Sequence, residues 1–148
     1  MTRRILVPID LAHEASFDIV FPAIKALARA HDAALYLMTV IPDDLTAWPY
    51  IPHSFVEDSR KQAEAQLTEI ADMDLPDDIE WHSQALVGSV APTIVRHAKE
   101  VGAGLIAITS HDPKALDILL GGVADRVLRR APCSVLVLRA AGGWQWNN

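Results

Sequence analysis

LIAITSHDPKALDILLGGVADRVLRRAPCSVLVLR, residues 105–139, contains the pattern from which the fold can be predicted. The run 105–108 is short and apolar with β-branched residues, as in a buried parallel strand. A polar loop follows, and then the pair Gly121-Gly122 precedes apolar residues at the spacing of one helix face. The apolar run 134–138 closes the segment. We therefore predict a strand, a loop, a helix and a strand, in that order.

Gly121-Gly122 also favours a chemical role for this segment. Glycine lets a ligand come close to the backbone, and the first N–H groups of a helix have no partner within the helix. Such a helix start binds anions. His111, in the loop before it, can donate a hydrogen bond to a phosphate or can simply pack within the loop. These residues predict a phosphate site.

The rest of the chain repeats the alternation of strands and helices. Apolar runs predict strands at 5–9 and 34–41, and alternation of apolar and polar residues predicts a third at 79–87, at a sheet edge. Periodic apolar positions predict helices at 13–31, at 55–72 and between Ser89 and Gly102. Alternation of this kind predicts an α/β domain: a five-stranded parallel sheet with four helices on its two faces.

Several residues predict details of the helices. Pro22 predicts either a kink in the first helix or a later start. Ser89 is expected to cap the third helix, and Gly102 is expected to end it. The charged residues of the second helix are expected to form a solvated face rather than an interaction code: Glu57, Arg60, Lys61, Glu64 and Glu69.

Composition excludes several classes of protein. A chain of 148 residues with 51% hydrophobic residues is typical of one globular domain. The net charge of −6 argues against general binding to nucleic acid or to anionic membranes. The single Cys133 excludes an internal disulfide and is expected to pack in the core.

The sequence contains no segment that predicts export or membrane insertion. Arg3-Arg4 is basic, but the apolar run after it is interrupted at Asp10, unlike a signal peptide. No apolar run reaches about 18 residues. We therefore expect a cytoplasmic protein.

Common catalytic motifs are missing. The sequence has no P-loop, no dinucleotide-binding Gly-x-Gly-x-x-Gly, no nucleophile elbow and no His-Glu-x-x-His helix. No general base with an evident partner can be named. We therefore expect no enzyme activity beyond, at most, slow hydrolysis of ATP.

The whole chain resembles the universal stress protein family. The matching segments are 4–10 (RILVPID), 119–124 (LLGGVA) and 129–139 (RRAPCSVLVLR), and the loop at Ser110-His111 is most similar to the F/G-type bacterial branch. The resemblance implies a Rossmann-like fold of the adenine nucleotide alpha-hydrolase-like type with strand order 3-2-1-4-5. This domain would span 1–139, followed by a tail, 140–148.

The resemblance also implies a site for an adenine nucleotide, ATP or a related one, with or without Mg²⁺. Asp10 would hold ribose or a cation, although the residues alone equally predict a cap for the next turn. Val40 would meet adenine, although its position alone predicts a core residue. The implied binding residues are Pro8, Ile9, Asp10, Val40, Thr109, Ser110, His111, Gly121, Gly122 and Val123.

The family pairs its last strand with a second copy, which implies a homodimer. An unpaired apolar edge strand invites aggregation, so pairing would also protect it. The implied interface residues are Val135, Leu136, Val137 and Leu138. Trp144 and Trp146 in the tail would either pack over this seam or belong to a flexible end.

The prediction for function is a stress-response regulatory protein that binds an adenine nucleotide. The main alternative is a nucleotide-free interaction module working through dimerisation and a protein partner whose identity the sequence leaves open. Thr109 and Asp112 replace loop glycines of the family, and Gly122 replaces its Ser or Thr, which favours this alternative. A nucleotide-using enzyme of a related superfamily is a third possibility.

Aromatic residues in or beside the loop 42–54 could form a lid, a partner surface or anchors for the loop: Trp48, Tyr50 and Phe55.

Overall fold

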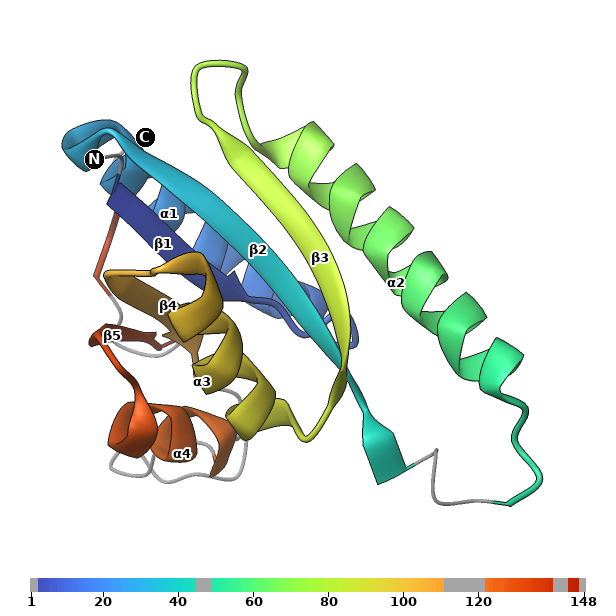
Figure 1. The fold of residues 1–148 in the computed structure, drawn as a ribbon. Helices are drawn as coiled ribbons and strands as arrows, with labels where there is room; N and C mark the ends of the chain where they lie inside the picture. Colours follow the sequence, from blue (N-terminus) through green and yellow to red (C-terminus); the bar gives the residue numbers. More distant parts are fainter. Residues whose placement is uncertain (1–2, 45–48, 111–121, 140–143, 147–148) are drawn as a thin grey trace.

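The computed structural model describes residues 3–44, 49–110, 122–139 and 144–146. Within these residues five strands alternate with four α-helices (Figure 1). The strands are β1 (Arg3–Pro8), β2 (Ala33–Pro42), β3 (Trp81–Gly88), β4 (Leu105–Thr109) and β5 (Ser134–Leu138). The helices are α1 (Phe17–His31), preceded by the 3₁₀ turn η1 (Glu14–Ser16), α2 (His53–Asp74), α3 (Val90–Val101) and α4 (Gly122–Arg130).

All the strand pairs are parallel, and the sheet order is β3-β2-β1-β4-β5. This confirms the predicted order 3-2-1-4-5 and the α/β class. Strand order reverses between β1 and β4, which pair at Ile5 with Leu105 and at Leu6 with Ile106. Loops that leave the carboxyl ends of strands diverge at such a point, and ligand crevices form there.

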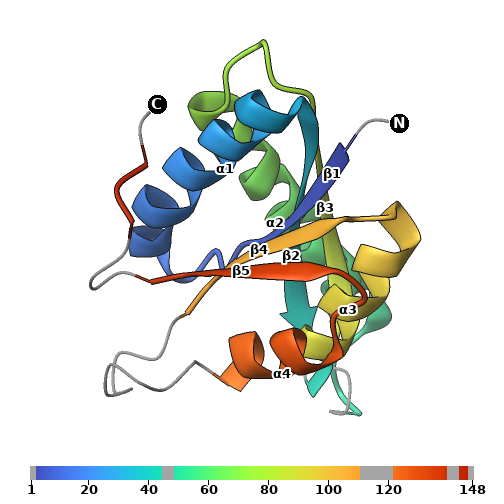
Figure 2. The same cartoon turned by 90° about the vertical axis from the view of Figure 1, so that its left-hand side faces the viewer.

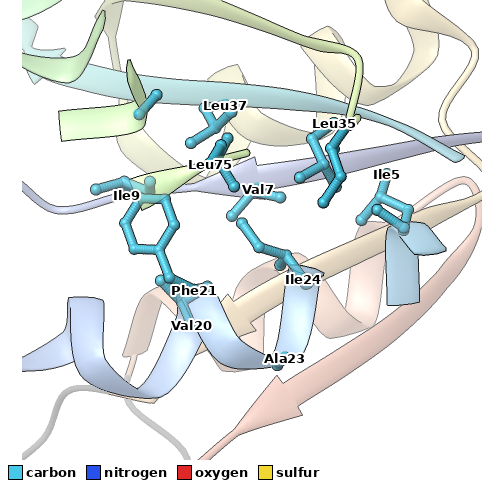
Figure 3. Close-up of a cluster of buried hydrophobic side chains, with 14 of the residues drawn as sticks. Ile5, Val7, Ile9, Val20, Phe21, Ala23, Ile24, Leu35, Leu37 and Leu75 are labelled. Atoms are coloured by element: carbon cyan, nitrogen blue, oxygen red, sulfur yellow. The ribbon is translucent and has the colours of Figure 1, made fainter. Parts of the chain in front are cut away.

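The helices form two layers. Figure 2 shows α1 and α2 on one side of the sheet and α3 and α4 on the other. Successive side chains of a strand point to opposite faces, so Ile5 and Val7 pack with α1 and α2 while Leu6 packs with α3 and α4. Figure 3 shows Val7 close to Phe21 and Ile24 in the first of these layers. Both faces of β1 are therefore buried, as its continuous apolar run predicts.

The predicted start of the first helix was wrong. Residues before Phe17 form η1, and the turn is held by bonds from the His13 N–H to the Asp10 carbonyl and from the Ser16 N–H to the His13 carbonyl, at 3.1 and 3.0 Å. Pro22 still lies inside α1. The helix therefore starts later, as one of the two alternatives predicted, and Pro22 remains inside it; a kink at Pro22 stays a prediction.

The ends of α3 agree only in part with the sequence. Gly102 ends the helix with a φ of +66°, in the left-handed region that glycine adopts readily. Ser89 occupies the predicted N-cap position, but its side chain makes no capping hydrogen bond. Gly88, just before it, packs against Thr93: a Cβ at Gly88 would lie 2.5 Å from Thr93 Oγ1.

Side chains of α2 bind the outer edge of β3 at Ala85. The Ala85 N–H donates to Glu64 Oε2 at 3.0 Å, and Arg60 donates to the Ala85 carbonyl at 3.3 Å. Arg60 and Glu64 also bind each other at 2.9 Å. The expected solvated face of α2 was therefore wrong at these two positions, because both side chains bind a strand edge.

β5 forms the other edge of the sheet. The Ser110 N–H donates to the Leu138 carbonyl at 3.0 Å, so Leu138 and Leu136 direct their backbone groups toward β4. The backbone groups of Val135 and Val137 point outward instead, since alternate residues of a strand face opposite neighbours. β5 thus presents an open row of donors and acceptors within the described chain.

Two aromatic residues near the loop 42–54 are exposed. Tyr50 is 90% exposed and Phe55 is 54% exposed, so these two aromatics do not anchor the loop, and Trp48 lies outside the described residues. Trp146 packs against the α1 side of the core, whereas Trp144 is exposed.

Cys133 is partly buried in the other layer, and this burial raises the pKa of its thiol. None of the described helices is both long and apolar enough to cross a bilayer.

Candidate functional site

A cavity of about 350 Å³ lies at the carboxyl ends of β1, β2 and β4, beneath the first turns of α3 and α4. Seven of the predicted site residues line it: Pro8, Ile9, Asp10, Val40, Thr109, Gly122 and Val123. The sheet brings them together because parallel strands end at one edge, and these residues lie at or beside strand ends or at a helix start. Most of the predicted set therefore converges on one crevice.

The inner wall of the cavity is apolar and was not predicted. Met38, Ile94 and Ile108 are almost fully buried and line the cavity behind the polar residues at its mouth. Thr39, Val90 and Ala124 complete the described lining. A signal for Met38 was present in the sequence, since it lies two residues before Val40 and so shares its face of the sheet.

The backbone of Val40 faces this crevice because β2 extends beyond β1. The Ile9 N–H donates to the Met38 carbonyl at 2.8 Å, so the even-numbered residues of β2 direct their backbone groups toward β1. Pairing of the two strands ends at Pro8 and Met38. Within the described chain, the N–H and C=O of Val40 therefore extend past the last pair and can bind a ligand.

Asp10 lies at the mouth of the cavity, with its side chain 44% exposed. Its Oδ1 accepts from the Ala12 N–H at 3.0 Å, and its Oδ2 lies 2.8 Å from His13 Nδ1. The carboxylate thus stabilises the turn that follows β1, as the simpler reading of the sequence predicts. It also lines the cavity, so this structural role and a ligand role are compatible.

Two helices begin at the cavity. Val90 opens α3, and Gly122 opens α4, followed by Val123 and Ala124. The first N–H groups of each helix lack partners within the helix, and the helix dipoles place partial positive charge there. Apart from the adjoining residues and the backbone of α4 itself, no described atom lies within 4 Å of where a Cβ at Gly122 would be. This end of the cavity is therefore suited to an anionic group.

Of the remaining predicted residues, only Ser110 is described, and it is not part of the described lining. The backbone of Ser110 binds Leu138 and so links the end of β4 to β5. His111 and Gly121 lie outside the described residues. Among the described side chains, no three His, Cys, Asp or Glu residues gather as a metal site.

The fold and the cavity together define a class: a doubly wound α/β domain with a ligand crevice where strand order reverses. The family model described as "Universal stress protein family" matches residues 1–139. The chain belongs to the universal stress protein family. The F/G-type branch stays a prediction.

Relatives of this chain share nearly its full length. It is 30% identical to "Universal stress protein A homolog 2" of Coxiella burnetii, over 95% of this chain and 97% of that protein. The crystal structure of a universal stress protein family member from Burkholderia pseudomallei is similar with a TM-score of 0.67 and 28% identity, over 90% of this chain and 93% of that one.

Two more distant structures share the fold and were solved with ligands. A universal stress protein from Archaeoglobus fulgidus in complex with dAMP has a TM-score of 0.64 and 20% identity, over 92% of this chain and 97% of that one. A universal stress protein in complex with cAMP has a TM-score of 0.66 and 19% identity, over 93% of this chain and 97% of that one. Both relatives bind adenine nucleotides.

Proposed function

We propose that this protein is a homodimeric stress-response regulator that binds an adenine nucleotide, ATP or a close relative, in the crevice between β1 and β4. The observation that carries this proposal is the pair of backbone groups of Val40, exposed beside an apolar wall. Support also comes from the two relatives solved with dAMP and cAMP, which share the fold.

The base would lie against the apolar wall. Met38, Ile94 and Ile108 offer a surface suited to the flat face of a purine. The N–H and C=O of Val40 present one donor and one acceptor from the same residue. Adenine carries a matching acceptor and amino donor on neighbouring ring positions, so the strand end can read its edge.

The ribose and the phosphates would extend toward the mouth of the cavity. Asp10 can accept hydrogen bonds from ribose hydroxyl groups or help to hold a cation. The free N–H groups at the start of α4 can bind phosphate oxygens. The protein has no evident general base placed for hydrolysis among its described cavity residues, so the nucleotide would act as a regulatory ligand.

Calorimetric titration with ATP, ADP and AMP, with and without Mg²⁺, tests this proposal. We expect binding in the wild type that is weakened at least severalfold by Asp10→Ala and left unchanged by Glu69→Ala, a variant on the exposed surface of α2. Absence of binding at millimolar nucleotide would overturn the proposal. Equal binding by wild type and Asp10→Ala would remove Asp10 from the site.

Gly122→Ser separates the proposal from its alternative, a nucleotide-free interaction module. A serine at this position restores the hydroxyl that the family carries there, and no side chain of the described residues lies within 4 Å of the Cβ that it would add. We expect it to tighten ATP binding more than adenosine binding. If only the variant binds ATP, the natural pocket has lost its ligand, and the interaction module becomes the better account.

A further inference from the structure

We propose that His13 is a positioning residue that holds the Asp10 carboxylate in the orientation in which it accepts hydrogen bonds from ligand hydroxyl groups. The inference rests on the proposed nucleotide site and adds a residue that does not line the described cavity. It concerns how the site is kept ready for a ribose rather than which residues touch it.

The two oxygens of Asp10 are each held by one donor. The Ala12 N–H binds Oδ1 at 3.0 Å, and His13 Nδ1 lies 2.8 Å from Oδ2. A carboxylate accepts and does not donate, so Nδ1 carries the proton in this bond. Each oxygen has a second lone pair, which stays available for a ligand. The two bonds together fix the rotation of the carboxylate at the cavity mouth.

His13 is itself held in place by the turn. Its N–H donates to the Asp10 carbonyl at 3.1 Å, and its carbonyl accepts from both the N–H and the hydroxyl of Ser16, at 3.0 and 2.7 Å. Ser16 is only 6% exposed, so this anchor lies within the folded core. The imidazole therefore approaches Asp10 from a backbone that is already fixed.

The exposure of the His13 and Asp10 side chains indicates that the hydrogen bond between them orients the Asp10 carboxylate more than it stabilises the fold. The side chains of His13 and Asp10 are 54% and 44% exposed, and half-exposed ion pairs contribute little to folding. Fixing a side chain before a ligand arrives removes the entropy cost of ordering it on binding. Loss of His13 would therefore weaken contacts made by Asp10, by about 2- to 10-fold in affinity.

The test compares two ligands and three proteins. ATP and 2′,3′-dideoxy-ATP are titrated calorimetrically into wild type, His13→Ala and His13→Asn. We expect His13→Ala to weaken ATP about 2- to 10-fold and to leave dideoxy-ATP unchanged, because only ATP carries the ribose hydroxyl groups. His13→Asn should restore ATP affinity, because the asparagine amide can donate from a position close to that of imidazole Nδ1.

Other results would overturn the inference in recognisable ways. If His13→Ala lowers the affinity for both ligands equally, His13 has a general structural role. If it leaves the affinity for ATP unchanged, His13 has no role in binding. Failure of His13→Asn to recover affinity would exclude the hydrogen bond as the cause. If wild type binds neither ligand, the proposed function itself fails and this inference falls with it. If wild type and His13→Ala bind ATP with equal affinity, the proposed function stands and this inference fails.

Discussion

Gly88 shows how a single residue joins two elements. It ends β3, and a Cβ there would lie 2.5 Å from the hydroxyl oxygen of Thr93, which is almost fully buried in α3. The φ of Gly88 is +158°, which a residue with a Cβ rarely adopts. We therefore expect Gly88→Ala to lower the free energy of unfolding by about 1 to 3 kcal/mol, through overpacking and backbone strain together. Urea unfolding followed by circular dichroism measures this change.

Gly104→Ala is the matched control for that experiment. Apart from its two chain neighbours, no described atom lies within 4 Å of a Cβ at Gly104, which immediately precedes β4. We expect its unfolding midpoint to stay close to that of the wild type. Equal destabilisation by both substitutions would contradict the argument, since the close approach to Thr93 and the positive φ are present only at Gly88.

Individual site residues could be predicted to different degrees. The resemblance identified Asp10 and Val40, and both line the cavity. Ile94 was missed because its helical spacing predicts only a core residue, and the cavity it lines forms only when α3 packs over β2. Likewise, the partnership of His13 with Asp10 depends on the 3₁₀ turn, which the apolar pattern of the following helix concealed.

At the scale of elements, the contact between α2 and β3 depends on a carboxylate. Ala85 is fully buried, and its N–H is satisfied by Glu64. We expect Glu64→Ala to destabilise the fold by about 1 to 3 kcal/mol, the cost of leaving a buried donor unpaired. Glu64→Gln keeps an acceptor and should lose less.

Thermal unfolding of three variants measures this effect. Glu69→Ala provides the comparison, because Glu69 is exposed on the same helix and makes none of the described contacts with β3. Loss of stability of the same size in Glu64→Ala and Glu69→Ala would show that removing any carboxylate from α2, and not the contact with the strand edge, is responsible.

A second contact between elements predicts a pH dependence. Arg29 of α1 binds both oxygens of Asp78, in the turn before β3, at 3.0 and 3.2 Å. The hydrogen bond from Arg29 and its charge lower the pKa of Asp78 below the ordinary value. Because the folded state holds the proton less tightly, the pair stabilises the protein above the ordinary pKa of Asp, about 4, and loses this effect as pH falls through the lowered value.

Asp78→Asn tests the sign of this dependence. Its unfolding free energy should fall below that of wild type at pH 7, and the difference should shrink toward zero as the pH is lowered below 4. Both side chains are substantially exposed, so we expect a small difference. Asp77→Asn on the same turn is the control. A difference that grows on acidification would contradict the assignment.

Helices and strands could be predicted where the apolar residues follow a single spacing. The apolar run around Leu6 predicted β1, and the helical spacing of Val20 and Ile24 predicted the buried face of α1. Strand order came from the resemblance, because alternation alone does not decide which strands are neighbours. Glu64 could not be placed on β3 from sequence, since its partner is a backbone group 21 residues away.

At the scale of the whole molecule, the proposed dimer depends on the open edge of β5. The outward backbone groups of Val135 and Val137 can pair with the same groups of a second copy around a twofold axis at Leu136. We expect Val137→Pro to convert the dimer to a monomer, because proline removes an outward N–H without breaking a bond to β4.

Light scattering after size-exclusion chromatography measures this change. Leu136→Pro is the contrasting variant, because it removes an N–H that faces β4 and should lower the unfolding temperature of the domain itself. A dimer that persists in Val137→Pro at micromolar concentration would place the interface elsewhere.

The binding of Arg60 and Glu64 to the edge of β3 has a consequence for assembly. In the language of polymer chemistry, a sheet with two open edges is a bifunctional monomer, which adds further copies at both ends and grows into a chain. A sheet with one edge blocked is monofunctional, and its growth terminates after a single coupling. Arg60 and Glu64 thus act as a chain stopper at Ala85, where they occupy both outward backbone groups, so association through β5 would be favoured over growth from β3.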